Sequence, residues 1–339
     1  MATRILIVRL SALGDTALTL PLLSALRAKL PEAYIGWLVG EYASPLLAGN
    51  PQLDCLHVWK KQDMNVSGLM RTAGEIRSQG YEISLDPQGL TISALFPLIA
   101  RIPHRAGFSR GFMDARELAP FFTNRKVKPP GTLIHITART LYLGKALGLD
   151  MPEDMPAPLP ADPPADEKID RWLGDAGIAS RVIVFGIGTG WRTRFWPVPQ
   201  IAKIMKAARG HGYACVVLWG PHETDQMEEW KGMLKDTAVW APATDISEMI
   251  ALLRRCERYA GPDSAPLHLA ALLEKPTFSW YGSTDPARTA PRGPRHARVA
   301  RGPHNWRRKR IFSTGLEKLS AEEVLPGFMD WLAWEPDKP

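Results

Sequence analysis

Asp15 is the residue of this 339-residue chain best placed for acid–base chemistry. It follows an apolar run, residues 4–10, of the kind that forms a strand buried on both faces of a parallel sheet. Gly14 permits a tight turn, and Asp15 and Thr16 are typical N-cap residues for the apolar helix that follows. Ligands of open α/β sheets bind beyond the carboxyl ends of the strands, so a carboxylate in this turn can take a proton from a nucleophile. The alternative is that Asp15 only caps the helix.

A glycine-rich loop in the second half of the chain suits a phosphate group. Residues 186–190 read Gly-Ile-Gly-Thr-Gly, which lets backbone amides approach an anion, and Thr189, Arg192 and Arg194 add polar contacts. The spacing is GxGxG rather than the GxGxxG of dinucleotide-binding loops, so a plain loop with surface arginines stays an alternative. Pro197 is predicted in the first turn of the next helix.

Two further loops of the second half carry acidic side chains and a helix start. Glu223 follows the strand-like run that ends at Trp219, where a carboxylate can accept hydrogen bonds from ribose hydroxyls. Asp263 and Ser264 are predicted to cap a helix whose first amides and dipole attract an anion. His268 lies one turn inside that helix and faces the same site or, alternatively, only packs there. Because all these loops follow strands, we expect them at one sheet edge, where together they suit a sugar diphosphate.

Alternating strand-like and helix-like segments must position these residues. In the first half, the predicted strands are residues 4–10, 34–39 and 81–86, and the predicted helices are residues 16–29 and a run that ends at Ile99. Pro21 is expected to bend the first helix or delay its start. In the second half, the predicted strands are residues 181–185, 213–219, 258–260 and 277–281. The alternation predicts an α/β fold with parallel sheets and crossover helices.

Prolines dominate the composition between residues 150 and 166. A connector of this kind marks a domain boundary, so we predict two Rossmann-like domains, residues 1–155 and 166–318, that face each other across a cleft. Residues 319–339 are predicted to form a C-terminal helix and tail that pack back on the first domain. The helix start is indicated by Ser320 with Glu323 three residues later, which is a capping signature.

The composition indicates a soluble protein with a basic balance of +7. Residues 288–310 hold many of the arginines, which suits an anionic membrane surface, a phosphorylated lipid or nucleic acid, or simply a solvated face. No helix-turn-helix, zinc-finger or RNP signature is present, so no nucleic-acid partner is expected. The three cysteines lack paired spacing, which favours a reducing cytoplasm over a disulfide framework or zinc site. No signal-peptide cleavage site and no apolar run of about 20 residues is found.

The order of the motifs resembles glycosyltransferase family 9, with a pattern most like its lipopolysaccharide heptosyltransferases. The segments that carry the resemblance are residues 11–15, 86–90, 189–197, 219–223, 263–268 and 282–286. The resemblance implies a GT-B architecture, with the acceptor bound by the first domain and the donor by the second. It also implies an inverting transfer of L-glycero-D-manno-heptose from ADP-heptose to a Kdo residue of the lipopolysaccharide inner core.

The resemblance further implies roles for individual residues. Asp15 is the implied general base for the acceptor hydroxyl, and Arg116, Lys60 and Lys61 are implied to bind the acidic acceptor. The implied donor-binding residues are Thr189, Gly190, Arg194, Glu223, Asp245, Asp263, Ser264, Ala265 and His268. Among them, Thr189 and the amides of Ser264 and Ala265 hold the diphosphate, Arg194 and Glu223 contact the ribose side, and Asp263 contacts the donor sugar. His268 meets the phosphate or the sugar, and residues 241–245 lie against adenine.

The same resemblance implies that no cofactor and no metal is required, because side chains and amides supply positive charge to the leaving diphosphate. The expected partners are ADP-heptose and a Kdo-lipid A type acceptor. We expect a monomer in the cytoplasm, peripherally associated with the inner membrane. The alternatives are a family-9 transferase with another nucleotide sugar or acceptor, including a protein, and a noncatalytic protein that binds anionic lipid.

Overall fold

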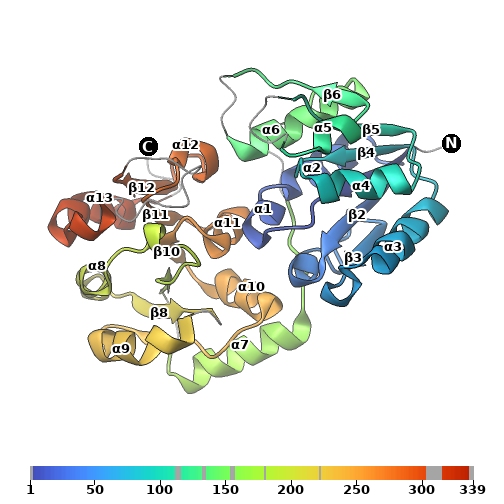
Figure 1. Ribbon diagram of the computed structural model, residues 1–339. Helices are drawn as coiled ribbons and strands as arrows, with labels where there is room; N and C mark the ends of the chain where they lie inside the picture. Colours follow the sequence, from blue (N-terminus) through green and yellow to red (C-terminus); the bar gives the residue numbers. More distant parts are fainter. Residues whose placement is uncertain are drawn as a thin grey trace. The chain divides into compact units, whose positions relative to one another are not determined.

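Two six-stranded parallel sheets form the framework of the structure (Figure 1). The computed structural model describes residues 3–110, 116–131, 135–152, 157–178, 181–220, 223–302 and 315–335. The chain divides into two units, Met1–Pro160 and Ala161–Pro339, and the division falls within the proline-rich segment. Each unit is built around its own sheet.

The first unit has the strand order of a Rossmann fold. Across the sheet the strands are β3 (Cys55–Trp59), β2 (Tyr34–Gly40), β1 (Arg4–Val8), β4 (Ile83–Asp86), β5 (His104–Phe108) and β6 (Arg125–Val127). All neighbouring pairs are parallel. The order 3-2-1-4-5-6 has a topological switch point between β1 and β4, and ligands of such sheets bind beyond the carboxyl ends of the strands at that point.

The helices of the first unit are α1 (Leu13–Ala17), α2 (Leu20–Lys29), α3 (Val66–Ser78), α4 (Thr91–Ile99), α5 (Ala119–Phe122) and α6 (Ile136–Tyr142), with short 3-10 segments at η1 (Glu41–Leu46), η2 (Lys61–Asp63) and η3 (Leu143–Leu147). Leu6 and Val8 of β1 belong to a buried cluster with Ile76 of α3 and Phe96 of α4. β1 is therefore covered by apolar side chains and holds its carboxyl end in a fixed place.

The single helix predicted over residues 16–29 is replaced by two helices, α1 and α2. The second helix starts at Leu20 with Pro21 in its first turn, which agrees with the late start expected from proline. Asp15 and Thr16 were predicted as N-caps, which is wrong: the N-cap is Ala12, and Asp15 lies in the first turn of α1. The helix starts earlier because Thr16 N–H and Thr16 Oγ1 both donate to the Ala12 carbonyl, at 2.8 and 3.0 Å.

The second unit repeats the strand order of the first. Its strands are β9 (Val239–Trp240), β8 (Ala214–Leu218), β7 (Val182–Gly186), β10 (Arg258–Pro262), β11 (Thr277–Tyr281) and β12 (His296–Ala300), and all neighbouring pairs are parallel. The switch point here lies between β7 and β10. The predicted α/β class with two Rossmann-like units is confirmed by these two sheets.

The helices of the second unit are α7 (Pro163–Asp175), α8 (Val198–Gly210), α9 (Thr224–Leu234), α10 (Ile246–Arg255), α11 (Ala265–Leu272), α12 (Pro286–Thr289) and α13 (Ala321–Ala333), with 3-10 segments at η4 (Arg192–Arg194) and η6 (Leu316–Lys318). Pro197 was predicted in the first turn of α8 but is its N-cap, because Val198 is the first helical residue. No helix in the described part of the chain is long and apolar enough to span a membrane.

The terminal helix α13 belongs to the core of the second unit. Phe328 and Trp331 pack with Phe278 of β11 in one aromatic group, with ring centroids 5.2 to 5.7 Å apart. Arg258 is buried and donates to the carbonyls of Trp331 and Trp334 at the end of this helix, at 3.1 and 2.7 Å. The Ser320–Glu323 capping box is present as predicted. The helix thus packs within the second unit, whereas the sequence predicted a return to the first domain.

Candidate functional site

Asp15 lies just past the carboxyl end of β1, beside the switch point of the first sheet. Its Oδ2 is 2.5 Å from Nη2 of Arg9, and the Arg9 side chain is 9% exposed against 40% for that of Asp15. Oδ1 of Asp15 has no hydrogen-bond or ion-pair partner in the described part of the chain. A half-exposed carboxylate held through one oxygen by a buried cation leaves its other oxygen able to accept a proton.

The residues predicted to bind the acceptor lie at the same edge of the first sheet. Lys60 and Lys61 are exposed and follow β3, and the Lys61 amide donates to Oε2 of Glu41 at 3.1 Å. Arg116 is exposed, and its amide donates to the Gly89 carbonyl, after β4, at 2.8 Å. These cations are suited to an acidic ligand, and their acceptor role stays a prediction.

Arg9 is the residue of this site that sequence reasoning missed. Its position directly after the apolar run of β1 could have indicated a buried ion pair, because arginine is rarely buried unless it is paired. Its partner Asp15 is six residues away in sequence, and the two meet because the chain turns sharply between β1 and α1.

In the second unit, the glycine-rich loop and Glu223 lie against each other. A Cβ at Gly188 would be 1.8 Å from the carboxyl carbon of Glu223, so only glycine leaves room for this carboxylate. Oε2 of Glu223 accepts the Gly220 amide at 2.9 Å. Thr189 is half-buried and accepts the Trp191 amide through its hydroxyl at 3.3 Å. The loops after β7 and β8 are therefore in contact.

Asp263 follows β10 on the other side of this switch point and lies between the side chains of His268 and Arg194. Its Oδ1 is 3.3 Å from Nε2 of His268, and its Oδ2 is 3.5 Å from Nη1 of Arg194, which also donates to the Asp263 carbonyl at 2.7 Å. Burial alone would raise the pKa of this carboxyl, but the hydrogen bond from His268 and the charge of Arg194 hold the pKa well below its usual range. A cluster with two basic groups at the start of α11 is suited to an anionic ligand.

Asp263 was predicted to contact the donor sugar directly. In the structure it is 2% exposed, and both carboxylate oxygens face basic groups of the chain itself. Ser264 takes the N-cap position of α11, but its hydroxyl donates to the Pro262 carbonyl at 3.2 Å and does not cap the helix. The predicted side-chain capping by Asp263 and Ser264 is therefore wrong, which leaves the first amide of α11, that of Ala265, without a cap from these two side chains.

A hydroxyl pair that the sequence did not indicate closes the same edge. Oγ1 of Thr193 and Oγ of Ser283 are 2.7 Å apart, and the Ser283 amide donates to the Thr193 carbonyl at 3.3 Å. The segment after β11 is thus fixed to the segment that carries Arg194. Gly190, in the same glycine-rich loop, is exposed.

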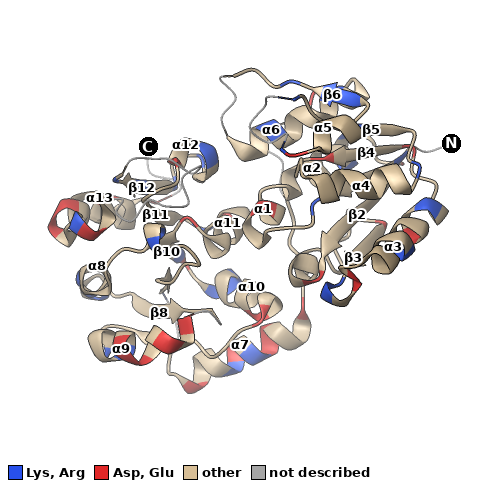
Figure 2. Ribbon diagram, in the orientation of Figure 1, with Lys and Arg blue, Asp and Glu red and all other residues tan. Residues whose placement is uncertain are grey.

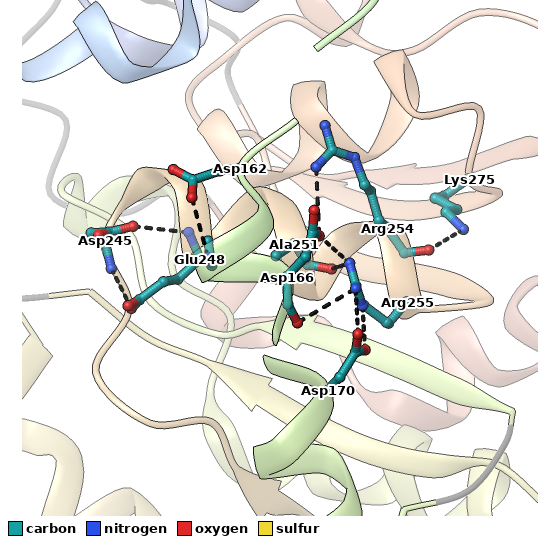
Figure 3. Close-up of polar contacts among 10 residues, drawn as sticks. Asp162, Asp166, Asp170, Asp245, Glu248, Ala251, Arg254, Arg255 and Lys275 are labelled. Carbon is teal, nitrogen blue, oxygen red and sulfur yellow. Dashed lines mark hydrogen bonds and ion pairs between the residues drawn. The ribbon is translucent and has the colours of Figure 1, made fainter. Parts of the chain in front are cut away.

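Asp245 has a structural partner at the start of α10. Its side chain accepts the Glu248 amide at 2.8 Å and its own amide donates to Oε2 of Glu248 at 3.1 Å, which is a capping box (Figure 3). Figure 3 also shows Arg255 of α10 between Asp166 and Asp170 of α7, with Nε 2.6 Å from Asp170. These contacts fix α10 and the segment before it. The adenine contact of residues 241–245 stays a prediction.

Among the described residues, no group of three or more His, Cys, Asp or Glu side chains could hold a metal ion. The clusters of polar side chains at the two switch points contain both acidic and basic residues. Each contains a buried or half-buried arginine beside a carboxylate, Arg9 with Asp15 and Arg194 with Asp263.

Comparison with known proteins gives consistent results. The model of glycosyltransferase family 9 (heptosyltransferase) matches residues 69–314. Lipopolysaccharide heptosyltransferase 1 of Pseudomonas aeruginosa is 28% identical over 302 residues, which is 86% of this chain and 81% of that protein. Lipopolysaccharide heptosyltransferase 3 of Escherichia coli is 27% identical over 286 residues, 80% of each chain. The structure of E. coli ADP-heptose lps heptosyltransferase II has a TM-score of 0.78, 20% identity and coverage of 97% and 98%, so the fold is shared.

Proposed function

Because this chain belongs to glycosyltransferase family 9 (heptosyltransferase), we propose that it transfers L-glycero-D-manno-heptose from ADP-heptose to a Kdo residue of the lipopolysaccharide inner core. Its relatives support this choice of substrates, since two are lipopolysaccharide heptosyltransferases and a third is an ADP-heptose lps heptosyltransferase. The observation that carries the proposal is the half-exposed carboxylate of Asp15 at the switch point of the first sheet, ion-paired to Arg9.

In the proposed reaction, Asp15 takes the proton of the acceptor hydroxyl as that oxygen attacks the anomeric carbon of the heptose. The bond from this carbon to the diphosphate oxygen breaks, its electron pair leaves with ADP, and the configuration inverts. Negative charge grows on the diphosphate, where fixed positive groups stabilise it most effectively. Arg194, His268 and the amides of Ser264 and Ala265 at the start of α11 are the groups proposed for this purpose, without a metal.

Acceptor binding is proposed for Arg116, Lys60 and Lys61. A Kdo residue is acidic, and exposed basic side chains at the edge that carries Asp15 favour such a ligand. We place the reaction at the cytoplasmic face of the inner membrane, where the basic net charge of +7 favours anionic lipids, and propose that the enzyme acts as a monomer.

The test is mass spectrometry of a Kdo-bearing lipid A acceptor after incubation with ADP-heptose and the protein. We expect a gain of one heptose unit, and we expect Asp15→Ala to lower turnover by about 10²–10⁴-fold because the base is missing. The matched control is Asp54→Ala. The Asp54 side chain is 36% exposed and lies 2.6 Å from Arg27, so this substitution removes a similar ion pair away from the proposed site.

Wild-type turnover in Asp15→Ala would exclude Asp15 as the base. Loss of activity on addition of EDTA would exclude a metal-independent reaction. If the acceptor gains no heptose unit, a panel of nucleotide sugars and acceptors tests the second candidate function, that of a family-9 transferase with another donor or acceptor. That candidate is favoured by the similarity to heptosyltransferase 3, which is nearly as high as that to heptosyltransferase 1.

A further inference from the structure

The sequence Asp-Pro-Gln-Gly at residues 86–89 has no part in the proposed reaction, but the structure gives every residue of it a contact. Asp86 is the last residue of β4 and is buried. Its Oδ1 accepts the amides of Gln88 and Gly89, at 3.0 Å each, and its Oδ2 accepts the Ser93 hydroxyl at 2.9 Å. Gly89 has a positive φ of 64°, which glycine adopts without strain. The four residues form a turn closed by its own first side chain.

Two other groups of this buried turn contact the segment that leads from β1 to Asp15. Oε1 of Gln88 accepts the Leu10 amide at 2.6 Å, and the Pro87 carbonyl accepts Nη1 of Arg9 at 3.0 Å. The Arg9 amide in turn donates to the Leu38 carbonyl of β2 at 3.0 Å. Arg9 is therefore fixed both at its backbone and at its guanidinium group.

The fixed guanidinium group is the one that contacts Asp15. Nη1 of Arg9 is occupied by the Pro87 carbonyl, which turns Nη2 toward Oδ2 of Asp15 at 2.5 Å. A guanidinium group is planar, so fixing one nitrogen sets the direction of the other. An aspartate that is 40% exposed would otherwise be free to rotate, and a displacement of about 1 Å costs a reaction about 10²-fold.

The same turn also reaches the residue predicted to meet the acceptor. The Gly89 carbonyl accepts the Arg116 amide at 2.8 Å, so the backbone of Arg116 is tied to the turn that holds Arg9. One turn at the switch point therefore supports both Asp15 and Arg116, although these residues lie about 100 positions apart in the chain.

We propose that Arg9 is a positioning residue for the Asp15 carboxylate and that the turn of residues 86–89 holds Arg9 in place. This inference rests on the proposed function of Asp15 as the base. Arg9 orients Oδ2 and thereby directs Oδ1 toward the acceptor hydroxyl, while the turn keeps the guanidinium group from following the carboxylate as it accepts the proton.

The experiment measures kcat and KM for both substrates in Arg9→Met, Gln88→Ala, Asp15→Ala and the double variant Arg9→Met/Asp15→Ala. We expect Arg9→Met to lower kcat by about 10–100-fold with the donor KM changed less than about 2-fold, because donor binding belongs to the second unit. Gln88→Ala is expected to show a smaller loss of the same kind. The matched control is Arg27→Met, which removes an ion-paired arginine of the same unit, 2.6 Å from Asp54, and is expected to keep kcat.

The double variant decides between positioning and a general structural effect. If Arg9 acts through Asp15, Arg9→Met causes no further loss once Asp15 is alanine, because no carboxylate remains to be oriented. If Arg9→Met lowers the residual turnover of Asp15→Ala by the same factor as in the wild type, the proposal is overturned. Should Arg9→Met fail to fold, Gln88→Ala replaces it in the same cycle. Failure of the proposed function is separate and shows as unchanged turnover in Asp15→Ala alone.

Discussion

Burial decides the direction of the pKa shift at Asp86 and His296, whereas the neighbouring side chains decide it at Asp263. Burial raises the pKa of Asp86 to about 6 despite its hydrogen bonds from Gly89 and Ser93. At Asp263 the pKa lies below the usual range, because His268 and Arg194 outweigh burial. Burial and the nearby Arg295 lower the pKa of His296 to about 4. Asp86 therefore favours the folded state toward low pH, and Asp263 and His296 favour it toward high pH.

His296 makes a pH-dependent contribution to stability. Its pKa is lower in the folded chain than the ordinary 6.5, so the unfolded chain binds more protons between pH 6.5 and pH 4. Its contribution is present above pH 6.5 and is lost as the pH falls toward 4. When the pH falls from 7 to 5, we expect the free energy of unfolding of His296→Gln to decrease less than that of the wild type. The expected difference between the two decreases is roughly 1–2 kcal/mol for this partly exposed group.

The measurement for His296 is the urea midpoint at the two pH values, with His104→Gln, a change at an exposed histidine of the first unit, as the control. An identical loss of stability in wild type and His296→Gln would show that this histidine does not contribute. The Thr277 hydroxyl, 3.0 Å from Nδ1 of His296, remains available to the glutamine amide.

At the scale of the elements, glycines at the carboxyl ends of β7 and β10 and in the loop after β7 leave room for specific side chains. A Cβ at Gly186 or Gly261 would be 2.3 Å from the buried Tyr259 hydroxyl, and a Cβ at Gly188 would meet Glu223. The GxGxG spacing of residues 186–190 therefore has a structural reason at two of its glycines, apart from any approach of a phosphate. The tyrosine ring is rigid and buried, whereas the glutamate can move.

Gly188→Ala is expected to displace Glu223 without unfolding the unit, because the clash involves the end of a flexible side chain. If Glu223 binds the ribose, ADP affinity falls by about 10-fold or more in Gly188→Ala and by a similar factor in Glu223→Ala. Isothermal titration calorimetry measures both affinities. Gly232→Ala, where an added Cβ meets no atom within 4 Å, is the control and is expected to bind ADP normally.

Two other outcomes of the ADP titrations would contradict the predicted role of Glu223. Unchanged ADP affinity in both Gly188→Ala and Glu223→Ala would remove Glu223 from the donor site. A loss in Gly188→Ala alone would instead indicate that the nucleotide approaches the loop backbone itself.

For the whole molecule, each unit has its own sheet and its own buried core, so ligand effects are expected to be local to one unit. Figure 2 shows both basic and acidic residues on α7 and α9 of the second unit, so we expect an anion to bind at its loops rather than along these helices. The residues proposed to bind the donor all belong to this unit. ADP should therefore act on the second unit first.

Hydrogen exchange with mass detection tests this division. ADP at about 100 times its Kd is expected to slow exchange in residues 182–194 and 258–272 of the second unit, since ligand binding stabilises the state that binds it by about 2.7 kcal/mol. Residues 4–17 and 83–93 of the first unit are expected to exchange as before. Protection confined to the first unit would reverse the assignment of donor and acceptor, and Arg194→Ala serves as a weakened-binding control.

Local patterns in the sequence were enough to predict the α/β class, the family and the loops that carry the candidate residues. Apolar β-branched runs form buried parallel strands wherever they pack, and Pro21 and the Ser320–Glu323 pair act within one turn of helix. Short edge strands escaped prediction, because strands such as β6 and β12 are largely exposed or half-buried and carry charged residues instead of a continuous apolar run. The N-caps Ala12 and Pro197 also differed from the prediction, because the first helical residue depends on individual backbone hydrogen bonds.

Only the tertiary structure decided which charges meet. Arg9 contacts the Pro87 carbonyl across 78 positions, and Arg194 contacts Asp263 across 69 positions. These pairs form because the strands that carry them, β1 with β4 and β7 with β10, are neighbours at the two switch points. Strand order is a property of the packed sheet, so the sequence alone predicted no ion pair for Asp15 or Asp263, and folding supplied Asp15 with the buried Arg9 and Asp263 with the half-buried Arg194.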